Sequence, residues 1–146
     1  MARKRAASKT GEVRLKTFLD SGVLIAAWKI DTLKDAARSI MADDRREFFS
    51  SQMVRLELLP KPRFEKRRTE VRFYENHFAE LVRFEPLSRE LAEEAEILAS
   101  RYGLSAADAL QIAAAIRQGV QEFWTTEKPG NPMFRVMEVK VLSLGA

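Results

Sequence analysis

The sequence has no cysteine and only one histidine, His77. Disulfide bonds, thiolate chemistry and a zinc cluster of Cys and His ligands are therefore excluded. No apolar run approaches the roughly 18 residues that a membrane span needs, and no signal-peptide pattern opens the chain. We expect a cytoplasmic protein without membrane contact, in which any catalysis must rest on carboxylates, hydroxyls or basic groups.

Basic residues are unevenly placed along the chain, whose net charge is +4. Residues 1–16 hold six Lys or Arg against one Glu, and residues 61–72 hold six against two. Because 146 residues suit one core, we expect a flexible basic tail at 1–14 and a single domain at 15–146. The second basic stretch predicts contact with nucleic acid, with a solvated helix face as the alternative. Its candidate RNA-binding residues are Arg63, Lys66, Arg67, Arg68 and Arg72.

Helix and strand patterns alternate along the domain. The expected strands are one that ends at Asp20 and residues 46–50, 82–87, 122–126 and 139–142. The expected helices are residues 23–28, 33–42, 53–59, 63–81, 88–99 and 105–117. Pro60 and Pro62 should end the third helix, and the fourth has an amphipathic spacing of apolar residues. This alternation predicts an α/β fold, a three-layer α/β/α sandwich around a central, largely parallel five-stranded sheet.

Four acidic residues lie at strand ends or in the helices that follow them: Asp20, Glu57, Asp108 and Glu127. Each also has a local explanation. Asp20 can cap a helix, and Asp108 stands three residues after Ser105, as in a capping box. Glu57 and Glu127 can be surface residues of a helix and a turn. Because the carboxyl ends of parallel strands share one edge of the sheet, we predict that the four carboxylates meet there.

A cluster of carboxylates needs a neutralising cation, because like charges repel one another. Oxygen ligands without His or Cys select a hard ion, Mg²⁺ or Mn²⁺. Magnesium keeps several waters and takes one or two carboxylates together with substrate phosphates. This combination predicts phosphodiester hydrolysis.

Four segments resemble the acidic motifs of PIN-domain nucleases, in the same order and with similar spacing. They are residues 18–25, 56–59, 107–115 and 125–127. In size the chain is similar to VapC-type toxins, the ribonucleases of type II toxin–antitoxin pairs. The resemblance implies metal-dependent RNA cleavage that leaves a 5′-phosphate and a 3′-hydroxyl. It also implies a small antitoxin as partner and a homodimer.

With this resemblance each acid receives a role. Asp20, Asp108 and Glu127 would hold Mg²⁺, directly or through water. Glu57 would position a second ion or orient the attacking water. These four residues are our candidate catalytic set, and the first three are the candidate metal ligands.

Neighbouring residues complete the expected site and also depart from the family pattern. The hydroxyls of Ser21 and Thr125 would hold the acids in place. The family usually has Asn or another small polar residue where this chain has Gly22, and Asp where it has Glu127. Glutamate is one methylene longer and can still reach a metal directly or through water, so altered or weak activity is one expectation.

Three other interpretations stay open. A haloacid dehalogenase-type phosphatase needs a second carboxylate where this chain has Gly22. A receiver domain needs an acidic pair on an earlier strand end and a late Lys, an arrangement that we do not find. The third is a catalytically weak or inactive PIN fold that binds RNA or protein. For a protein partner, Leu24, Trp28 and Leu33 could line an apolar groove, unless they belong to the core.

Overall fold

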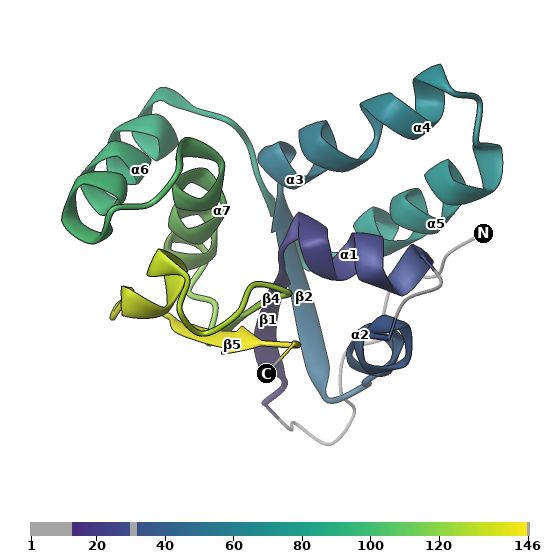
Figure 1. The fold of residues 1–146 in the computed structure, drawn as a ribbon, viewed down its shortest axis with the longest axis horizontal. Helices are drawn as coiled ribbons and strands as arrows, with labels where there is room; N and C mark the ends of the chain where they lie inside the picture. Colours follow the sequence, from purple (N-terminus) through teal and green to yellow (C-terminus); the bar gives the residue numbers. More distant parts are fainter. Residues whose placement is uncertain (1–12, 30–31, 146) are drawn as a thin grey trace.

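The computed structural model describes residues 13–29 and 32–145, and its strands form one five-stranded sheet. Every pairing is parallel, and the strand order is β3-β2-β1-β4-β5. Figure 1 shows the sheet nearly edge-on. The predicted α/β fold is confirmed, and the sheet is parallel throughout. The strands are β1 (Leu15–Leu19), β2 (Arg46–Ser51), β3 (Arg83–Glu85), β4 (Glu122–Thr125) and β5 (Lys140–Ser143).

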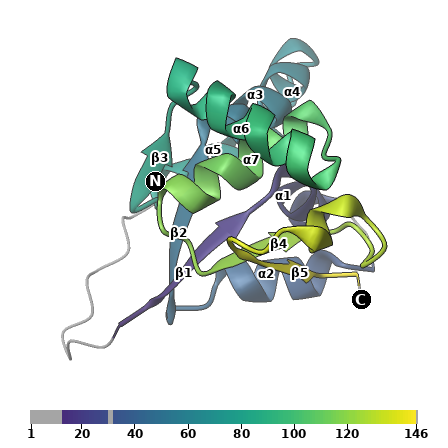
Figure 2. The ribbon, with the colours of Figure 1, turned by 90° about the vertical axis from the view of Figure 1, so that its left-hand side faces the viewer.

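Helices cover both faces of the sheet (Figures 1 and 2). One side carries α1 (Ser21–Trp28), α2 (Lys34–Met41) and α5 (Arg68–Ala79), and the other side carries α6 (Arg89–Tyr102) and α7 (Ala106–Arg117). Beyond the end of β2 lie α3 (Gln52–Leu58) and α4 (Pro60–Phe64), and a short 3₁₀ helix spans Pro132–Arg135. No helix in residues 13–29 and 32–145 is long and apolar enough to cross a membrane.

The expected helix over residues 63–81 is wrong, because the chain forms two helices there. Pro60 opens α4 in its first turn, where a missing N–H costs no hydrogen bond. Proline therefore starts a helix here as well as ending the one before it. Lys66 then adopts a left-handed φ of 56°, which interrupts the helical conformation before α5 begins at Arg68. Phe64, one of the apolar residues in the spacing of the expected helix, is 87% exposed.

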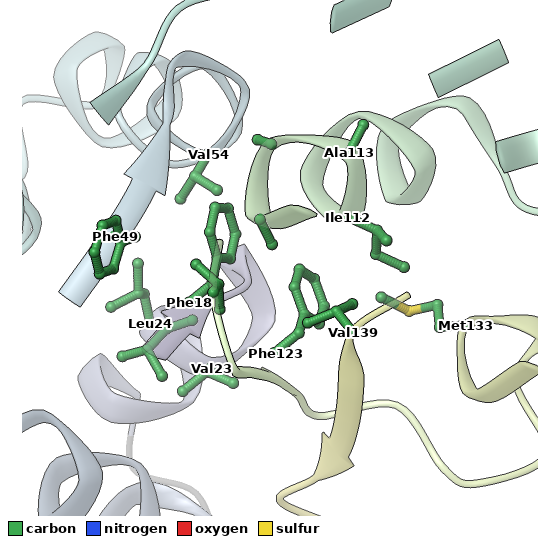
Figure 3. Close-up of a cluster of buried hydrophobic side chains, with 14 of the residues drawn as sticks. Phe18, Val23, Leu24, Phe49, Val54, Ile112, Ala113, Phe123, Met133 and Val139 are labelled. Atoms are coloured by element: carbon green, nitrogen blue, oxygen red, sulfur yellow. The ribbon is translucent and has the colours of Figure 1, made fainter. Parts of the chain in front are cut away.

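The core lies between β1, β4 and the helices on either face (Figure 3). Phe18 and Phe123 stack with ring centroids 5.2 Å apart, and both are fully buried. Leu19, the next residue on β1, is also fully buried, so this strand is covered on both faces as a parallel sheet requires. His77 is buried as well and meets the ring of Phe48 edge-on. His77 is therefore packed among the core side chains.

The predicted apolar groove on α1 is not a surface groove. Leu24 is fully buried, and Leu33 packs against the core. Trp28 is half-buried, with its ring 5.5 Å from that of Phe73 on α5. Trp28 therefore joins α1 to α5. Most of the expected tail, residues 1–12, lies outside the described part of the chain.

Candidate active site

The candidate site lies where the order of the strands reverses. From β1 the chain builds outward through β2 and β3, and then returns to add β4 and β5 on the other side. In parallel α/β sheets ligands bind in the crevice outside the carboxyl ends of the strands at such a point. Asp20 directly follows β1, and Glu127 follows β4 by two residues. The backbone N–H of Asp20 donates to the carbonyl of Trp124, at 3.0 Å, which brings the two strand ends together.

Asp20 is both a helix cap and a member of an acidic cluster. Its Oδ1 accepts a hydrogen bond of 3.0 Å from the backbone N–H of Val23, so the capping explanation is correct. Its side chain also bonds with Thr125. Burial is the main reason that the pKa of Asp20 rises to about 7, and the negative charges of Asp108 and Glu127 raise it further. Capping alone would not bring those two carboxylates within range.

Thr125 connects two of the acids from its fully buried position at the end of β4. Its hydroxyl is hydrogen-bonded to Asp20 and accepts a bond of 3.1 Å from the backbone N–H of Glu127. Glu127 itself is exposed in the loop, where its carbonyl accepts a 2.6 Å bond from Ser143 on β5. The Glu127 side chain thus stands on a backbone that is fixed on both sides.

Glu57 reaches the same region from α3. Its Oε1 accepts hydrogen bonds from the Ser21 hydroxyl, at 3.3 Å, and from the side-chain amide of Gln111. Partial burial is the main reason that the pKa of Glu57 is raised, and the charge of Asp108 adds to it, whereas the two hydrogen bonds oppose the shift. The charge of Asp108 therefore acts on the carboxyl groups of both Asp20 and Glu57.

Gln111 is the residue that sequence reasoning missed. It is 3% exposed, and its side chain donates to Glu57 while accepting a 3.3 Å bond from the backbone N–H of Ser21. One amide thereby joins α1, α3 and α7. A signal was present in the sequence, since Gln111 stands three residues after Asp108 and so shares its helix face.

Asp108 occupies the first turn of α7 and satisfies half of the expected capping box. The Ser105 hydroxyl accepts a 3.3 Å bond from the Asp108 backbone N–H. The Asp108 carboxylate is partly exposed, and its charge raises the pKa values of Asp20 and Glu57. A helix-start position and a place in the cluster are therefore compatible.

The donor chemistry of this cluster fits a hard divalent cation. Asp20, Asp108 and Glu127 offer only carboxylate oxygens, which suit Mg²⁺ or Mn²⁺. A cation between them would relieve the repulsion that helps to raise the pKa of Asp20. Within residues 13–29 and 32–145 no three Asp, Glu, His or Cys side chains are arranged as a ready metal cage. Such a cage is not required by Mg²⁺, which keeps several of its waters.

The sequence matches a known family over most of its length. The family model of the PIN domain matches residues 17–128. The chain belongs to the PIN-domain family. All four candidate acids of this PIN domain fall inside the matched residues. A search of curated proteins finds no match.

Solved structures share the fold of this PIN domain. VapBC2 from Rickettsia felis, bound to a promoter DNA fragment, has a TM-score of 0.66 at 14% identity, covering 88% of this chain and 98% of its own. A toxin-antitoxin complex from Klebsiella pneumoniae has a TM-score of 0.66 at 16% identity, covering 88% and 97%. VapC20 from Mycobacterium tuberculosis, a Sarcin-Ricin loop cleaving toxin, has a TM-score of 0.63 at 21% identity, covering 85% and 98%.

The expected RNA-binding residues of this PIN domain line one cavity of about 400 Å³ between α4 and α5. Two of them are also in ion pairs: Arg63 with Glu75 at 2.8 Å, and Arg67 with Glu65 at 2.6 Å. The break between the two helices folds the basic stretch around this hollow. We call it the basic cavity; besides Pro62, Val71 and Glu75, its lining is Arg63, Lys66, Arg67, Arg68 and Arg72.

A second, smaller cavity of about 160 Å³ lies beside the basic cavity and is lined by one of the four candidate acids. Arg67 and Pro62 line both cavities, and Glu57 lines the second. Lys29 and Lys61 add two further cations to its wall. The two cavities therefore adjoin at Pro62 and Arg67, with Glu57 on the far wall of the smaller one.

Proposed function

We propose that this PIN domain is a Mg²⁺- or Mn²⁺-dependent endoribonuclease that acts as the toxin of a type II toxin–antitoxin pair. The observation that carries the proposal is the raised pKa of Asp20, which is buried at the switch point within the fields of Asp108 and Glu127. Strongly perturbed carboxylates in a crevice are typical of functional sites. Their location at the carboxyl ends of β1 and β4 is where this class of sheet binds ligands.

Asp20, Asp108 and Glu127 would hold the cation. When bound there, the ion would increase the acidity of a coordinated water and offset negative charge that develops on the phosphate. Thr125 fixes the Asp20 side chain and the Glu127 backbone through its hydrogen bonds, so the Asp20 carboxylate and the point from which the Glu127 side chain extends are both held in place.

Glu57 would accept a proton from the attacking water or orient it. Ser21 and Gln111 hold Oε1 of Glu57 and leave its other carboxylate oxygen for this task. The raised pKa of Glu57 makes it a stronger base than an ordinary surface glutamate. Hydrolysis would leave a 5′-phosphate and a 3′-hydroxyl.

The substrate would reach this site along the two adjoining cavities. The basic residues around the larger cavity would bind phosphates of the RNA chain, and the smaller cavity would lead the strand past Arg67 to Glu57. Arg68 and Arg72 are exposed residues of α5 on this wall. The likeness of the fold to VapC20, described as a toxin that cleaves the Sarcin-Ricin loop, supports RNA as the substrate.

The proposed protein partner is an antitoxin. We also propose that this chain forms a homodimer and acts in the cytoplasm. Support comes from the similar structures, which include VapBC2 and a second toxin-antitoxin complex. A partner that covered Glu57 and the basic cavity would block the path of the substrate, and its binding segment would need acidic residues to match the cations there.

The test is cleavage of a labelled RNA by the purified chain, with Mg²⁺ and with EDTA. The wild type should cleave RNA only with the cation, and Asp20→Asn and Asp108→Asn should be inactive. The matched control is Glu47→Gln, a carboxylate at the start of β2, on the opposite edge of the sheet. An equal amount of unlabelled DNA, added as a competitor, tests specificity for RNA and should not reduce cleavage of the labelled RNA. Binding of RNA without cleavage under any of these conditions would identify an inactive RNA-binding PIN fold instead.

A further inference from the structure

Gly22 is closed to any side chain by a hydroxyl from another part of the chain. It lies in the first turn of α1, and a Cβ built on it would come within 2.6 Å of Thr126 Oγ1. The same Cβ would lie 3.3 Å from Oδ1 of Asp20. The hydroxyl of Thr126 therefore occupies the space of a side chain at position 22, next to the Asp20 carboxylate.

The backbone gives no other reason for glycine at this position. Among the described residues the glycines with positive φ are Gly103 and Gly119, so Gly22 has a conformation that other residues adopt. Glycine is an unfavourable choice inside a helix compared with alanine. A side chain at position 22 would instead have to displace the Thr126 hydroxyl.

Thr126 reaches this space because of where β4 ends. The preceding Thr125 is fully buried and bonded to Asp20, and Glu127 follows directly. Thr126 is partly exposed between these two site residues. Thr125 thus bonds Asp20 directly, whereas the Thr126 hydroxyl and Asp20 Oδ1 both border the point where a Cβ at position 22 would lie.

We propose that the Thr126 hydroxyl is a positioning group for Asp20 and for the cation that Asp20 holds, in place of a polar side chain at position 22. The inference rests on the proposed metal-dependent function. A neutral oxygen at this point can donate a hydrogen bond to the carboxylate or to a water of the ion, and so orients both. Gly22 and Thr126 then act as a pair in which only one position can carry a side chain.

The first experiment is a thermal-melt cycle that needs neither metal nor substrate. Gly22→Ala should lower the melting temperature in the wild-type background, because the new methyl forces the Thr126 hydroxyl to move. In a Thr126→Ala background the obstructing Oγ1 is absent and the nearest remaining Thr126 atom, Cβ, lies at an ordinary 3.7 Å. There Gly22→Ala should raise the melting temperature, since alanine favours the helix. Additive shifts of one sign would contradict the pairing.

The second experiment measures Mn²⁺ binding by electron paramagnetic resonance. Thr126→Val keeps the shape of the side chain and removes only the hydroxyl, so it should weaken Mn²⁺ binding by about tenfold. Thr126→Ser should recover most of the affinity. Gly22→Ser in the Thr126→Ala background should bind more tightly than Thr126→Ala alone, because it returns a hydroxyl from the other side. Thr69→Val, an exposed threonine of α5, is the matched control.

The outcomes separate this inference from the proposed function. If the wild type binds Mn²⁺ and cleaves RNA, and Thr126→Val does both equally well, the inference alone fails and Thr126 only fills space. If the wild type does neither, the proposed function fails and the inference fails with it. Loss of Mn²⁺ affinity in Thr126→Val with an unchanged melting temperature is the result that the proposal requires.

Discussion

Replacing Asp20 with asparagine should stabilise the protein when no metal is present. The substitution keeps the shape of the side chain, and asparagine is as good a helix cap as aspartate. It removes a charge that is 7% exposed and that lies near two other carboxylates. A functional residue of this kind is held at a cost in folding stability.

The size of the gain follows from the pKa of Asp20. Its rise from the ordinary 3.8 to about 7 corresponds to about 4 kcal/mol of unfavourable free energy for the ionised form. The asparagine NH₂ group needs a new partner, for which the Thr125 oxygen is available only by reorientation, and this reduces the gain by about 1–3 kcal/mol. We expect a net stabilisation of about 2 kcal/mol, or about 6 °C in melting temperature.

The dependence on pH has a definite sign. Because the folded state raises the pKa of Asp20, it holds the proton more tightly than the unfolded state does. The wild type should therefore lose stability as the pH rises from about 4 to about 7, and then lose no more. Asp20→Asn should be less stable than the wild type by about 1–3 kcal/mol at pH 4, where the carboxyl is protonated and only the cost of the NH₂ group remains. At pH 8 it should be more stable by about 2 kcal/mol.

Urea melts in EDTA at pH 4, 6 and 8 measure this difference, and a parallel series contains Mg²⁺. At about 100 times its dissociation constant the ion should stabilise the wild type by about 2.7 kcal/mol and the variant by much less. Asp35→Asn, an exposed acid in the first turn of α2, is the control and should cost about 0.5 kcal/mol or less at each pH. Equal destabilisation by Asp20→Asn at pH 4 and pH 8, without a shift in Mg²⁺, would refute the reasoning.

Three further predictions concern the surroundings of the acids. The double variant Arg68→Ala/Arg72→Ala should weaken RNA binding and reduce its salt dependence by roughly one unit of slope per lost phosphate contact. The control double variant Arg89→Ala/Lys140→Ala should change neither. Filter binding between about 50 and 200 mM salt measures both. Gln111→Leu removes a bond that lowers the pKa of Glu57, so the acidic limb of the cleavage rate against pH should move to higher pH; an unmoved limb would mean that Glu57 is not the base. Trp28→Ala should cost about 2 kcal/mol of unfolding free energy in urea, because its ring packs on Phe73; an unchanged value would return Trp28 to the surface.

The alternation of strands and helices, and the positions of the acids at strand ends and helix starts, could be predicted from the sequence alone. Local patterns of apolar residues predict the strands and helices of a parallel sheet. Asp20 follows its strand directly, and Glu127 follows its strand by two residues. Carboxyl ends of parallel strands lie on one edge by geometry, so proximity of these acids follows from the fold class. The PIN motifs add the order in which the four acids occur.

The tertiary structure alone decided how these residues are held and where local rules fail. Pro60 opens α4, which packs against α5, where the sequence pattern predicted one helix over residues 63–81. Gln111 contacts Glu57 across 54 residues of sequence, and the Thr126 hydroxyl fills the space at Gly22. Contacts of this kind depend on how separate elements pack, whereas sequence patterns report only on residues a few positions apart.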